Sequence, residues 1–279
     1  MTHSNSWWIV TDLDGTLLDH SYSWEPARTT LRWLQEQQIP VIPCTSKTAE
    51  EVRGFRDDAG LRDPFIVENG GAIHGEDARG EEWEEALGIH HSHLRPQLDA
   101  LEALLGERLM PLEELSESEG QRLLGLGGEA LAQAQRRCWS VPFVPPSAEG
   151  RKRLPALAAS LGLGVVQGNR MSHLLQGGTG KGQAIASLKT LLHQPDVEVL
   201  ALGDSPNDAS LLNAGDISVV VPGPKGPHPH FATAIAEGRF ALAPAPHASG
   251  WACSVLTAVK ARVSAELAAT APEPPLDWP

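Results

Sequence analysis

The sequence predicts an α/β protein with a Rossmann-like parallel sheet core, helices on both faces of the sheet, and an inserted α+β cap domain. Short apolar runs alternate with helical patterns in the first third of the chain, and the same alternation returns in the last third. Short links between such elements favour parallel strands that are covered on both faces. The middle third has a different pattern, which predicts a second domain.

The first third begins with a short, partly β-branched strand. Its expected elements are a strand over Trp7–Val10, a helix over Glu25–Gln38, a strand over Ile39–Cys44, a helix over Thr48–Ala59 and a strand over Phe65–Val67. Pro26 suits the first turn of the first helix, and Gly60 suits the end of the second. The letters ENGG at residues 68–71 predict a turn.

The middle of the chain predicts the inserted domain, at residues 84–172, so that the core domain comprises residues 1–83 and 173–279. Helices are expected over Ser92–Leu105, Glu119–Leu126, Glu129–Arg137 and Ala148–Leu161, and strands over Cys138–Val144, Leu163–Gln167 and Arg170–Leu175. The acid-rich letters EEWEEA at residues 81–86 predict a solvated connection between the two domains.

The last third returns to the opening pattern. Helices are expected over Lys181–His193, Pro206–Ala214 and Ser254–Ala269, and strands over Val197–Leu202 and Ile217–Val221. The proline- and glycine-rich residues 222–229 predict a loop. The tail, from about residue 268 to residue 279, is expected to be disordered.

Composition limits the classes of partner. The 279 residues carry a formal charge of −13, which argues against binding to a nucleic-acid backbone. No apolar run is long enough to span a membrane, and the N-terminus lacks the pattern of a signal peptide, so we expect a cytoplasmic protein that does not bind membranes. The three cysteines match neither a disulfide framework nor a zinc site. The oligomeric state stays open.

Two acidic clusters follow predicted strands. Asp12 and Asp14 come after the first strand, and Asp204 and Asp208 come after the strand at 197–202. Ligands of open α/β sheets bind outside the carboxyl ends of the strands. Carboxylates that converge there repel one another unless a cation lies between them, and Mg²⁺ prefers oxygen ligands. One cluster alone could instead cap a helix, but the pair predicts a magnesium site.

Two further segments offer groups that bind anions. Thr45, Ser46 and Lys47 follow the second strand, where hydroxyl groups and the N–H groups of the next helix would form an anion cradle. Lys181 lies in GGTGKGQA, at the start of a helix. This segment does not fit the P-loop of nucleotide-binding proteins, because Leu175 and Gly182 occupy positions that require glycine and serine or threonine.

Together, D-x-D-G-T, the Thr at a strand end, the isolated Lys and G-D-x-x-N-D resemble the haloacid dehalogenase superfamily of phosphatases. The resemblance implies that Asp12 attacks phosphorus and forms an aspartyl-phosphate. It implies that Asp14 protonates the leaving oxygen and then activates water.

The same resemblance assigns the remaining groups around the phosphate. It implies Mg²⁺ as cofactor, bound by Asp12, the backbone carbonyl of Asp14 and Asp204, with Asp208 supporting it directly or through water. Thr45 and Lys181 would hold phosphate oxygens.

A narrower resemblance concerns the substrate. The segments DLDGTLLDHSYSWEPA, TSKTAEEV, PFIVENGGAI and GNRMSHLL resemble the mannosyl-3-phosphoglycerate phosphatase family, which releases phosphate and mannosylglycerate. Such a substrate is a phosphorylated sugar-glycerate, so the site should offer cations and hydrogen-bond donors. The expected substrate-binding residues are Ser46, Lys47, Glu68, Asn69, Arg137, Ser140, Arg170, His173 and Asn207.

Several of these residues have a plainer alternative. Arg170 could be a solvated surface arginine and His173 a histidine of the core. Asn69 could serve only to shape a turn. Asn207 could orient Lys181 rather than a ligand.

Other functions share the core motifs. The alternatives are a glucosyl-3-phosphoglycerate phosphatase, a phosphatase of the sucrose-phosphate type, a phosphomannomutase, and a sensor that binds a sugar phosphate without catalysis.

Overall fold

Five parallel strands form the main sheet of the computed structural model, which describes residues 7–77 and 79–275. The strands are β1 (Trp7–Thr11), β2 (Val41–Pro43), β9 (Glu198–Gly203), β10 (Ile217–Val220) and β11 (Ala241–Leu242), in the order β11-β10-β9-β1-β2. The first strand therefore lies inside the sheet, between β9 and β2, and Trp7 pairs with Glu198 from the last third of the chain. The predicted parallel sheet is confirmed.

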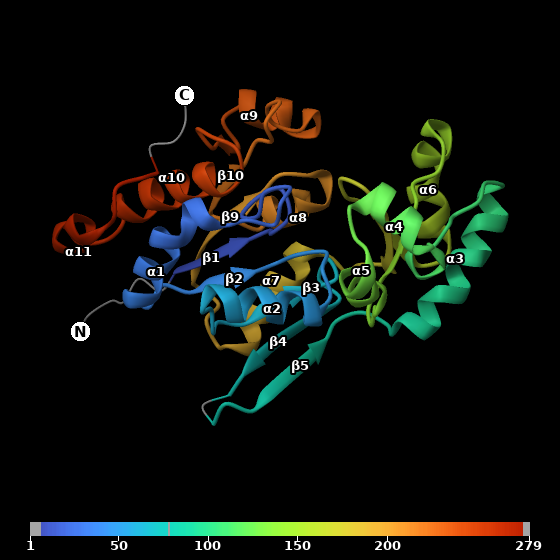
Figure 1. Cartoon of the computed structure of the whole chain (residues 1–279), viewed down its shortest axis with the longest axis horizontal. Helices are drawn as coiled ribbons and strands as arrows, with labels where there is room; N and C mark the ends of the chain where they lie inside the picture. Colours follow the sequence, from blue (N-terminus) through green and yellow to red (C-terminus); the bar gives the residue numbers. More distant parts are fainter. Residues whose placement is uncertain (1–6, 78, 276–279) are drawn as a thin grey trace.

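Alternate residues of β1 face two different helical layers. Trp7 and Ile9 pack with α1 (Arg28–Glu36), α2 (Ala49–Ala59) and α10 (His247–Lys260). Trp8 and Val10 pack against the other layer. That layer contains α7 (Lys181–Leu191), α8 (Ala209–Asn213), the 3-10 turn η4 (Pro229–Phe231) and α9 (Ala232–Ala236). Helices thus cover both faces of the sheet, as predicted (Figure 1).

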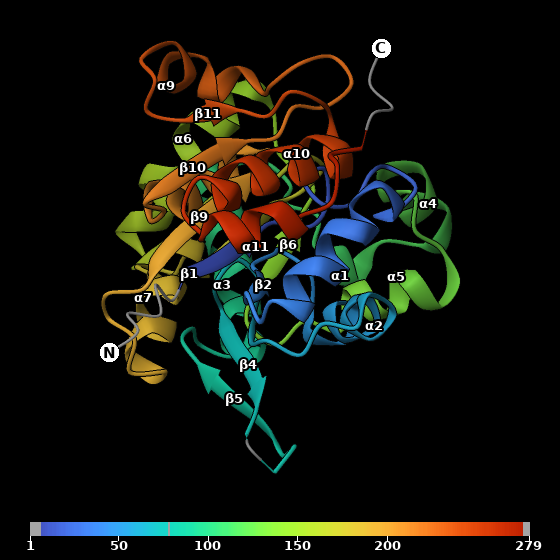
Figure 2. The same cartoon turned by 90° about the vertical axis from the view of Figure 1, so that its left-hand side faces the viewer.

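An antiparallel extension continues from β2. It consists of β3 (Phe65–Val67), β4 (Ala72–Glu76) and β5 (Glu82–Ala86), and a single bridge between Cys44 and Ile66 joins it to the main sheet. The hairpin of β4 and β5 projects from the large unit (Figure 1). Residues 81–86 are mostly exposed, as predicted, but they include β5, a strand of this projecting hairpin, rather than a simple connection (Figure 2). A Cβ at Gly75 would lie 2.2 Å from the Trp83 ring, so one tryptophan anchors an otherwise acidic strand.

A second, smaller unit lies beside the large one (Figure 1). Its antiparallel sheet contains β6 (Val141–Phe143), β8 (Ser172–Gln176) and β7 (Leu163–Gln167), in that order. A leucine-rich core forms with α3 (His91–Leu105) and α6 (Ala148–Ser160), and a second cluster forms with η2 (Leu112–Glu114), α4 (Glu117–Leu124) and α5 (Gly128–Gln135). We call this unit the small unit.

The predicted domain boundaries cut through strands. Residue 84 lies within β5, whose partner β4 belongs to the large unit, and residue 172 begins β8, the middle strand of the small sheet. The connections between the units are residues 87–90 and residues 177–180, which we call the first and second linkers.

The C-terminal third also differs from the prediction. The expected helix over Ser254–Ala269 is two helices, α10 and α11 (Ala265–Thr270), and α10 begins earlier, directly after Pro246. The expected disordered tail overlaps α11, and its last residues, 276–279, lie outside the described residues. The expected helix at 206–214 is η3 (Pro206–Asp208) followed by α8, and η1 (Glu25–Ala27) precedes α1. Among the described residues, no helix combines the length and apolarity needed to cross a membrane.

Candidate active site

The first acidic loop leaves β1, an inner strand of the sheet. Asp12 directly follows β1 and is buried. Gly15 has a positive φ of 90°, and a Cβ there would lie 2.6 Å from Oδ2 of Asp204, so glycine is required for the close approach of the second acidic loop. The Thr16 hydroxyl donates a hydrogen bond to Oδ1 of Asp204 at 3.1 Å and lies 3.5 Å from Oδ2 of Asp12. The two acidic loops thus meet directly.

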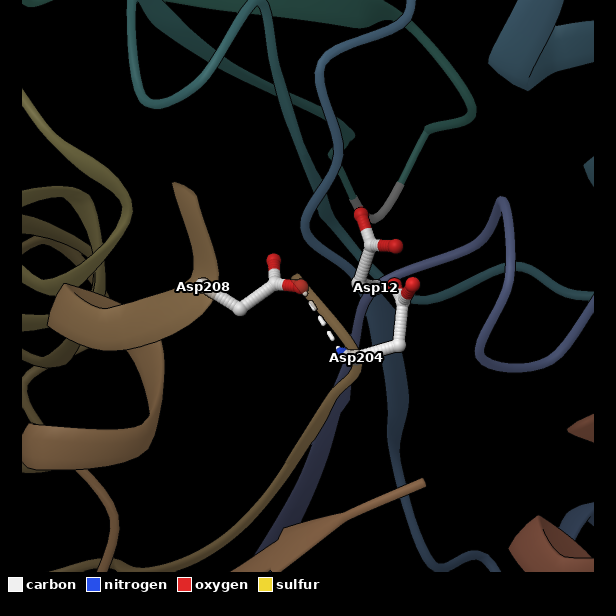
Figure 3. Close-up of side chains that lie close together, drawn as sticks. All are labelled: Asp12, Asp204 and Asp208. Atoms are coloured by element: carbon white, nitrogen blue, oxygen red, sulfur yellow. Dashed lines mark hydrogen bonds between the residues drawn. The ribbon is translucent and has the colours of Figure 1, made fainter. Parts of the chain in front are cut away.

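The second acidic loop follows β9 and folds around its own carboxylate. Oδ2 of Asp208 accepts hydrogen bonds from the backbone N–H groups of Asp204, at 2.9 Å, and Ser205, at 3.0 Å. Figure 3 shows the first of these bonds and the three neighbouring carboxylates. A Cβ on Gly203 would lie 2.5 Å from Cβ of Asp208, so a larger residue would displace this carboxylate.

Lys181 joins the two loops through a buried ammonium group. Its Nζ lies 2.7 Å from Oδ1 of Asp12 and 2.6 Å from Oδ1 of Asp208. The lysine is the first residue of α7, and it is 1% exposed. Burial works to lower the pKa of Lys181, but the two carboxylates outweigh burial and raise it. The ammonium group therefore stays charged.

The site has more negative charge than one lysine can offset. Asp12, Asp204 and Asp208 offer ligand oxygens that lie within 4.8 Å of one another. Burial raises the pKa of Asp12 to about 7, with a further contribution from Asp208 and an opposing one from Lys181. Burial and the two neighbouring acids also raise the pKa of Asp204. A hard divalent cation would remove this cost, so the donor set fits Mg²⁺.

The three carboxylates differ in which donors they bind. Both oxygens of Asp208 accept hydrogen bonds, from Lys181 and from the backbone, so Asp208 orients the lysine and the loop. Asp204 accepts from the uncharged Thr16 and Asn169 side chains, and Oδ2 of Asp12 has a contact of 3.5 Å to Thr16. Among the described residues, the cluster consists of Asp12, Asp204 and Asp208, and the side chain of Asp14 is not part of it.

Asp14 faces the pocket and pairs with Lys47. Oδ2 of Asp14 lies 3.0 Å from Nζ of Lys47, which is also 3.5 Å from Glu51 and 4.7 Å from the centre of the Tyr22 ring. Burial works to lower the pKa of Lys47, but Asp14 and Glu51 outweigh it and raise the pKa. A permanent positive charge therefore lies next to the Asp14 carboxylate.

The hydroxyl groups after β2 lie at the same edge of the sheet. Thr45 is fully buried, and its Oγ1 accepts a hydrogen bond from the N–H of Lys47 at 3.3 Å. Ser46 lines the pocket, and its carbonyl accepts a bond of 2.5 Å from the Arg137 guanidinium. The predicted anion cradle thus also contacts the small unit.

A pocket of about 530 Å³ lies between the two units. Nine of the residues predicted for the site line it: Asp12, Asp14, Ser46, Lys47, Arg137, Arg170, His173, Asp204 and Asn207. Thr45, Lys181 and Asp208 are buried behind this lining. The acids and the predicted cations of the two units therefore face one shared cavity.

The small unit contributes His173 and Arg170 to the pocket wall. Leu174 packs into the core formed with α3 and α6, so His173 on the same strand points to the opposite face of the sheet. Burial, with smaller effects of Arg137 and Lys181, lowers the pKa of His173 to about 3. Its Nδ1 is buried without a hydrogen-bond partner among the described residues. The Arg170 guanidinium donates to the carbonyl of Leu124.

Three residues predicted to bind substrate do not line the pocket. The Glu68 carboxylate accepts bonds from the N–H groups of Cys138 and Trp139 and from the hydroxyl of Ser140, at 2.8, 3.1 and 2.6 Å. Asn69 is also buried. Glu68 and Ser140 are hydrogen-bonded to each other inside the protein, whereas Nδ2 of Asn69 is buried without a partner among the described residues. Substrate binding by these three residues stays a prediction.

Asn207 has a pocket-facing position but is also held in place. Its Nδ2 donates to Oδ1 of Asn69 at 2.9 Å, and its Oδ1 accepts from the Ser205 hydroxyl at 2.5 Å. Among the described residues, no hydrogen bond joins it to Lys181, so the suggested orientation of the lysine falls to Asp208 instead.

Other pocket residues were missed by the sequence reasoning. Asn169 of the small unit donates from Nδ2 to Oδ2 of Asp204 at 2.8 Å, across the gap between the units. Lys225, His228 and His247 line the pocket from the loop after β10 and the start of α10. Asn169 could have been found, because it directly precedes the predicted Arg170. The others come from a loop whose proline and glycine content indicated only a turn.

Two family models match separate parts of the chain. The model of the haloacid dehalogenase-like hydrolases matches residues 9–103, and that of sucrose-6F-phosphate phosphohydrolase matches residues 164–252. The first match includes the loop of Asp12 and Asp14, and the second includes Lys181 and both acids of the second loop.

Solved structures share the fold at low sequence identity. A Streptococcus mutans protein has a TM-score of 0.68 and 18% identity, over 91% of this chain and 98% of that one. The sucrose-phosphatase of Synechocystis has a TM-score of 0.62 and 18% identity, over 91% and 97%. A haloacid dehalogenase-like hydrolase of B. subtilis has a TM-score of 0.56 and 21% identity, over 76% and 88%. These structures show that the chain has the fold of these proteins, and the two family models match its first and last parts.

Proposed function

We propose that the protein is a haloacid dehalogenase-like hydrolase, and specifically a Mg²⁺-dependent phosphatase that cleaves mannosyl-3-phosphoglycerate into mannosylglycerate and phosphate. The observation that carries the phosphatase chemistry is the buried bridge from Lys181 to Asp12 and Asp208, with Asp14 two residues from Asp12 at the pocket. This arrangement offers a nucleophile, a fixed positive charge and a second acid at one place.

In the first step, an Asp12 carboxylate oxygen attacks phosphorus while the bond from phosphorus to the leaving oxygen breaks. Asp14 gives its proton to that oxygen, which leaves as the alcohol. Lys181 already holds Oδ1 of Asp12, so Oδ2, beside the Thr16 hydroxyl, is the oxygen free to attack. Asp14 must leave Lys47 to carry the proton, and the phosphate then takes its place beside the lysine.

In the second step, water attacks phosphorus while the bond from phosphorus to the Asp12 oxygen breaks. Asp14 takes the proton of that water, and inorganic phosphate and free Asp12 result. Bound Mg²⁺, held by Asp12 and Asp204, would neutralise charge on the phosphate oxygens. The position of Asp14 favours a phosphatase over a dehalogenase, because a halide leaving group requires no proton.

The pocket supports a substrate with a second negative charge. Lys47, Arg137, Arg170 and Lys225 all line it, although the protein as a whole has a formal charge of −13. A phosphorylated sugar-glycerate has a phosphate for the acidic edge and a carboxylate for the remaining cations. The likeness of YSWEPA and VENGGAI to the mannosyl-3-phosphoglycerate phosphatase family favours mannose as the sugar.

A second candidate substrate is sucrose 6-phosphate. The family model of sucrose-6F-phosphate phosphohydrolase matches residues 164–252, which include β8 of the small unit with His173. This observation favours a sugar phosphate without a carboxylate, and glucosyl-3-phosphoglycerate is a further alternative. We still favour mannosyl-3-phosphoglycerate, because its carboxylate can bind the cations that line the pocket.

Phosphate release in the presence of Mg²⁺ tests the proposal. The substrates to compare are mannosyl-3-phosphoglycerate, glucosyl-3-phosphoglycerate, sucrose 6-phosphate and mannose 6-phosphate, with Asp12→Asn as the inactive control. We expect kcat/KM to favour mannosyl-3-phosphoglycerate by about a hundredfold or more, a difference of about 2.7 kcal/mol. Equal turnover of all four would reject the named substrate, and turnover by Asp12→Asn would reject the nucleophile.

A further inference from the structure

The turn at Glu68–Gly71, which we call the ENGG turn, lies outside the pocket lining but contacts several loops around the site. Glu68, Asn69 and Gly70 have positive φ angles of 48°, 59° and 94°. A glutamate in the left-handed region is uncommon, and strain of this kind persists only where surrounding contacts fix it.

Three contacts connect the turn to the small unit. The carbonyl of Gly71 accepts hydrogen bonds from Leu87 and Gly88 of the first linker, at 2.9 and 3.0 Å. A Cβ on Gly70 would lie 2.3 Å from the carbonyl oxygen of Gly180 in the second linker. The Glu68 carboxylate binds residues 138–140, in the loop between α5 and β6 that we call the interface loop.

The same turn contacts the loops that position the reacting groups. The N–H of Glu68 donates to the carbonyl of Lys47, and the N–H of Asn69 donates to the carbonyl of Thr45, both at 2.9 Å. Oδ1 of Asn69 accepts from Asn207, in the second acidic loop, and Gly70 lies against the backbone that leads into Lys181. One turn thus touches both linkers, of which the second leads into Lys181, the interface loop, the loop after β2 and the second acidic loop.

We infer that Glu68 is a positioning residue, which sets the orientation of the small unit relative to the phosphate site. Its carboxylate is 1% exposed, and it accepts hydrogen bonds from three donors of the interface loop. Arg137 precedes this loop segment directly and donates to Ser46. Loss of the Glu68 hydrogen bonds would therefore displace Arg137, which is one of the cations of the pocket. It would also displace the side of the pocket that the small unit forms.

The substitution Glu68→Gln probes this role with little change of shape. A carboxylate accepts hydrogen bonds at both oxygens, whereas the amide of glutamine places a donor against at least one N–H or O–H group. Glu102→Gln is the matched control: Glu102 accepts the N–H of Leu109 at 2.7 Å and pairs with Arg108, and both partners lie within the small unit. Ser140→Ala removes one donor and is the milder variant.

The kinetic experiment rests on the proposed phosphatase function. It measures kcat and KM for the preferred sugar phosphate and for p-nitrophenyl phosphate, which is small enough to need only the large unit. For Glu68→Gln we expect KM for the sugar phosphate to rise about ten- to a hundredfold, with p-nitrophenyl phosphate changed about twofold or less. Ser140→Ala should have a smaller effect, and the double variant should be no worse than Glu68→Gln, because both remove the same contact.

A second measurement does not depend on activity. Hydrogen exchange of the backbone N–H groups of Cys138 and Trp139 should accelerate about tenfold or more in Glu68→Gln and stay unchanged in Glu102→Gln. Unchanged exchange in Glu68→Gln would overturn the inference, even if the chain hydrolyses no phosphate ester. Equal losses for the sugar phosphate and p-nitrophenyl phosphate would also overturn it. If Glu68→Gln does not fold, the same two outcomes apply to Ser140→Ala.

Discussion

On the large unit's wall of the pocket, the reactive side chains are bonded to one another, whereas on the small unit's wall they are left partly unbonded. Lys181 holds Asp12 and Asp208 through two short ion pairs. His173, by contrast, has no partner at Nδ1 among the described residues, and Arg170 donates only to a backbone carbonyl. The difference teaches that chemistry needs fixed charges, while recognition needs polar groups that remain available to a ligand.

The largest expected effect concerns the ion pairs that Lys181 forms with Asp12 and Asp208 on the large unit's side of the pocket. Lys181→Met would leave Asp12 and Asp208 buried without their shared ammonium group. We expect the free energy of unfolding to fall by about 3–5 kcal/mol in the presence of a chelator, measured by urea titration. Lys225→Met is the control, because this exposed lysine should change stability by about 0.5 kcal/mol or less. An equal loss of unfolding free energy in the two variants would show that the Lys181 ion pairs do not hold this side of the pocket rigid.

A smaller effect concerns His173, on the small unit's side of the pocket, and is measured as the dependence of stability on pH. The pKa of His173 in the folded chain is about 3, below its unfolded value of about 6.5. Below pH 6.5 the unfolded chain binds a proton that the folded chain does not, so stability falls as pH falls. From pH 7 to pH 5, the native chain should lose about 2 kcal/mol more than His173→Asn. Parallel stability curves of the two proteins would refute a buried neutral histidine.

The smallest effect concerns recognition alone. Arg170→Ala should raise KM for the preferred sugar phosphate about tenfold, equal to about 1.4 kcal/mol, and leave p-nitrophenyl phosphate hydrolysis unchanged. Arg122→Ala is the control, because Arg122 is an exposed arginine of α4 that does not line the pocket. A fall in kcat for both substrates would mean that Arg170 belongs with the catalytic groups.

Sequence reasoning predicted the site residues of the large unit more completely than those of the small unit. Asp12 and Asp204 were placed together because each follows a strong apolar strand, and parallel strands end at one edge. Glu68 was assigned to the substrate because the turn after the third strand could reach the site. Its partners lie about 70 positions away, in the interface loop, and no local pattern reveals such a pairing.

Two secondary-structure errors have a similar physical origin. The strand β5 has mostly exposed acidic residues, and a single packed ring, that of Trp83, holds it on Gly75 of β4. The last helix was predicted to begin at Ser254, whereas α10 begins at His247 and includes Gly250. A Cβ at Gly250 would lie 1.7 Å from the carbonyl oxygen of Ala245, so glycine is needed there for packing. Tertiary contacts decide both cases.

The pairing of β1 with β9 has a consequence for how the protein is made. Thr16 and Asp204 meet although 188 positions separate them, and β1 is paired on one side by a strand from much later in the chain. Until the ribosome has made that strand, β1 has an unpaired edge. We expect the small unit, whose strands and helices are contiguous, to fold first on the emerging chain. The phosphate site is then completed only after Asp204 and Asp208 have been synthesised.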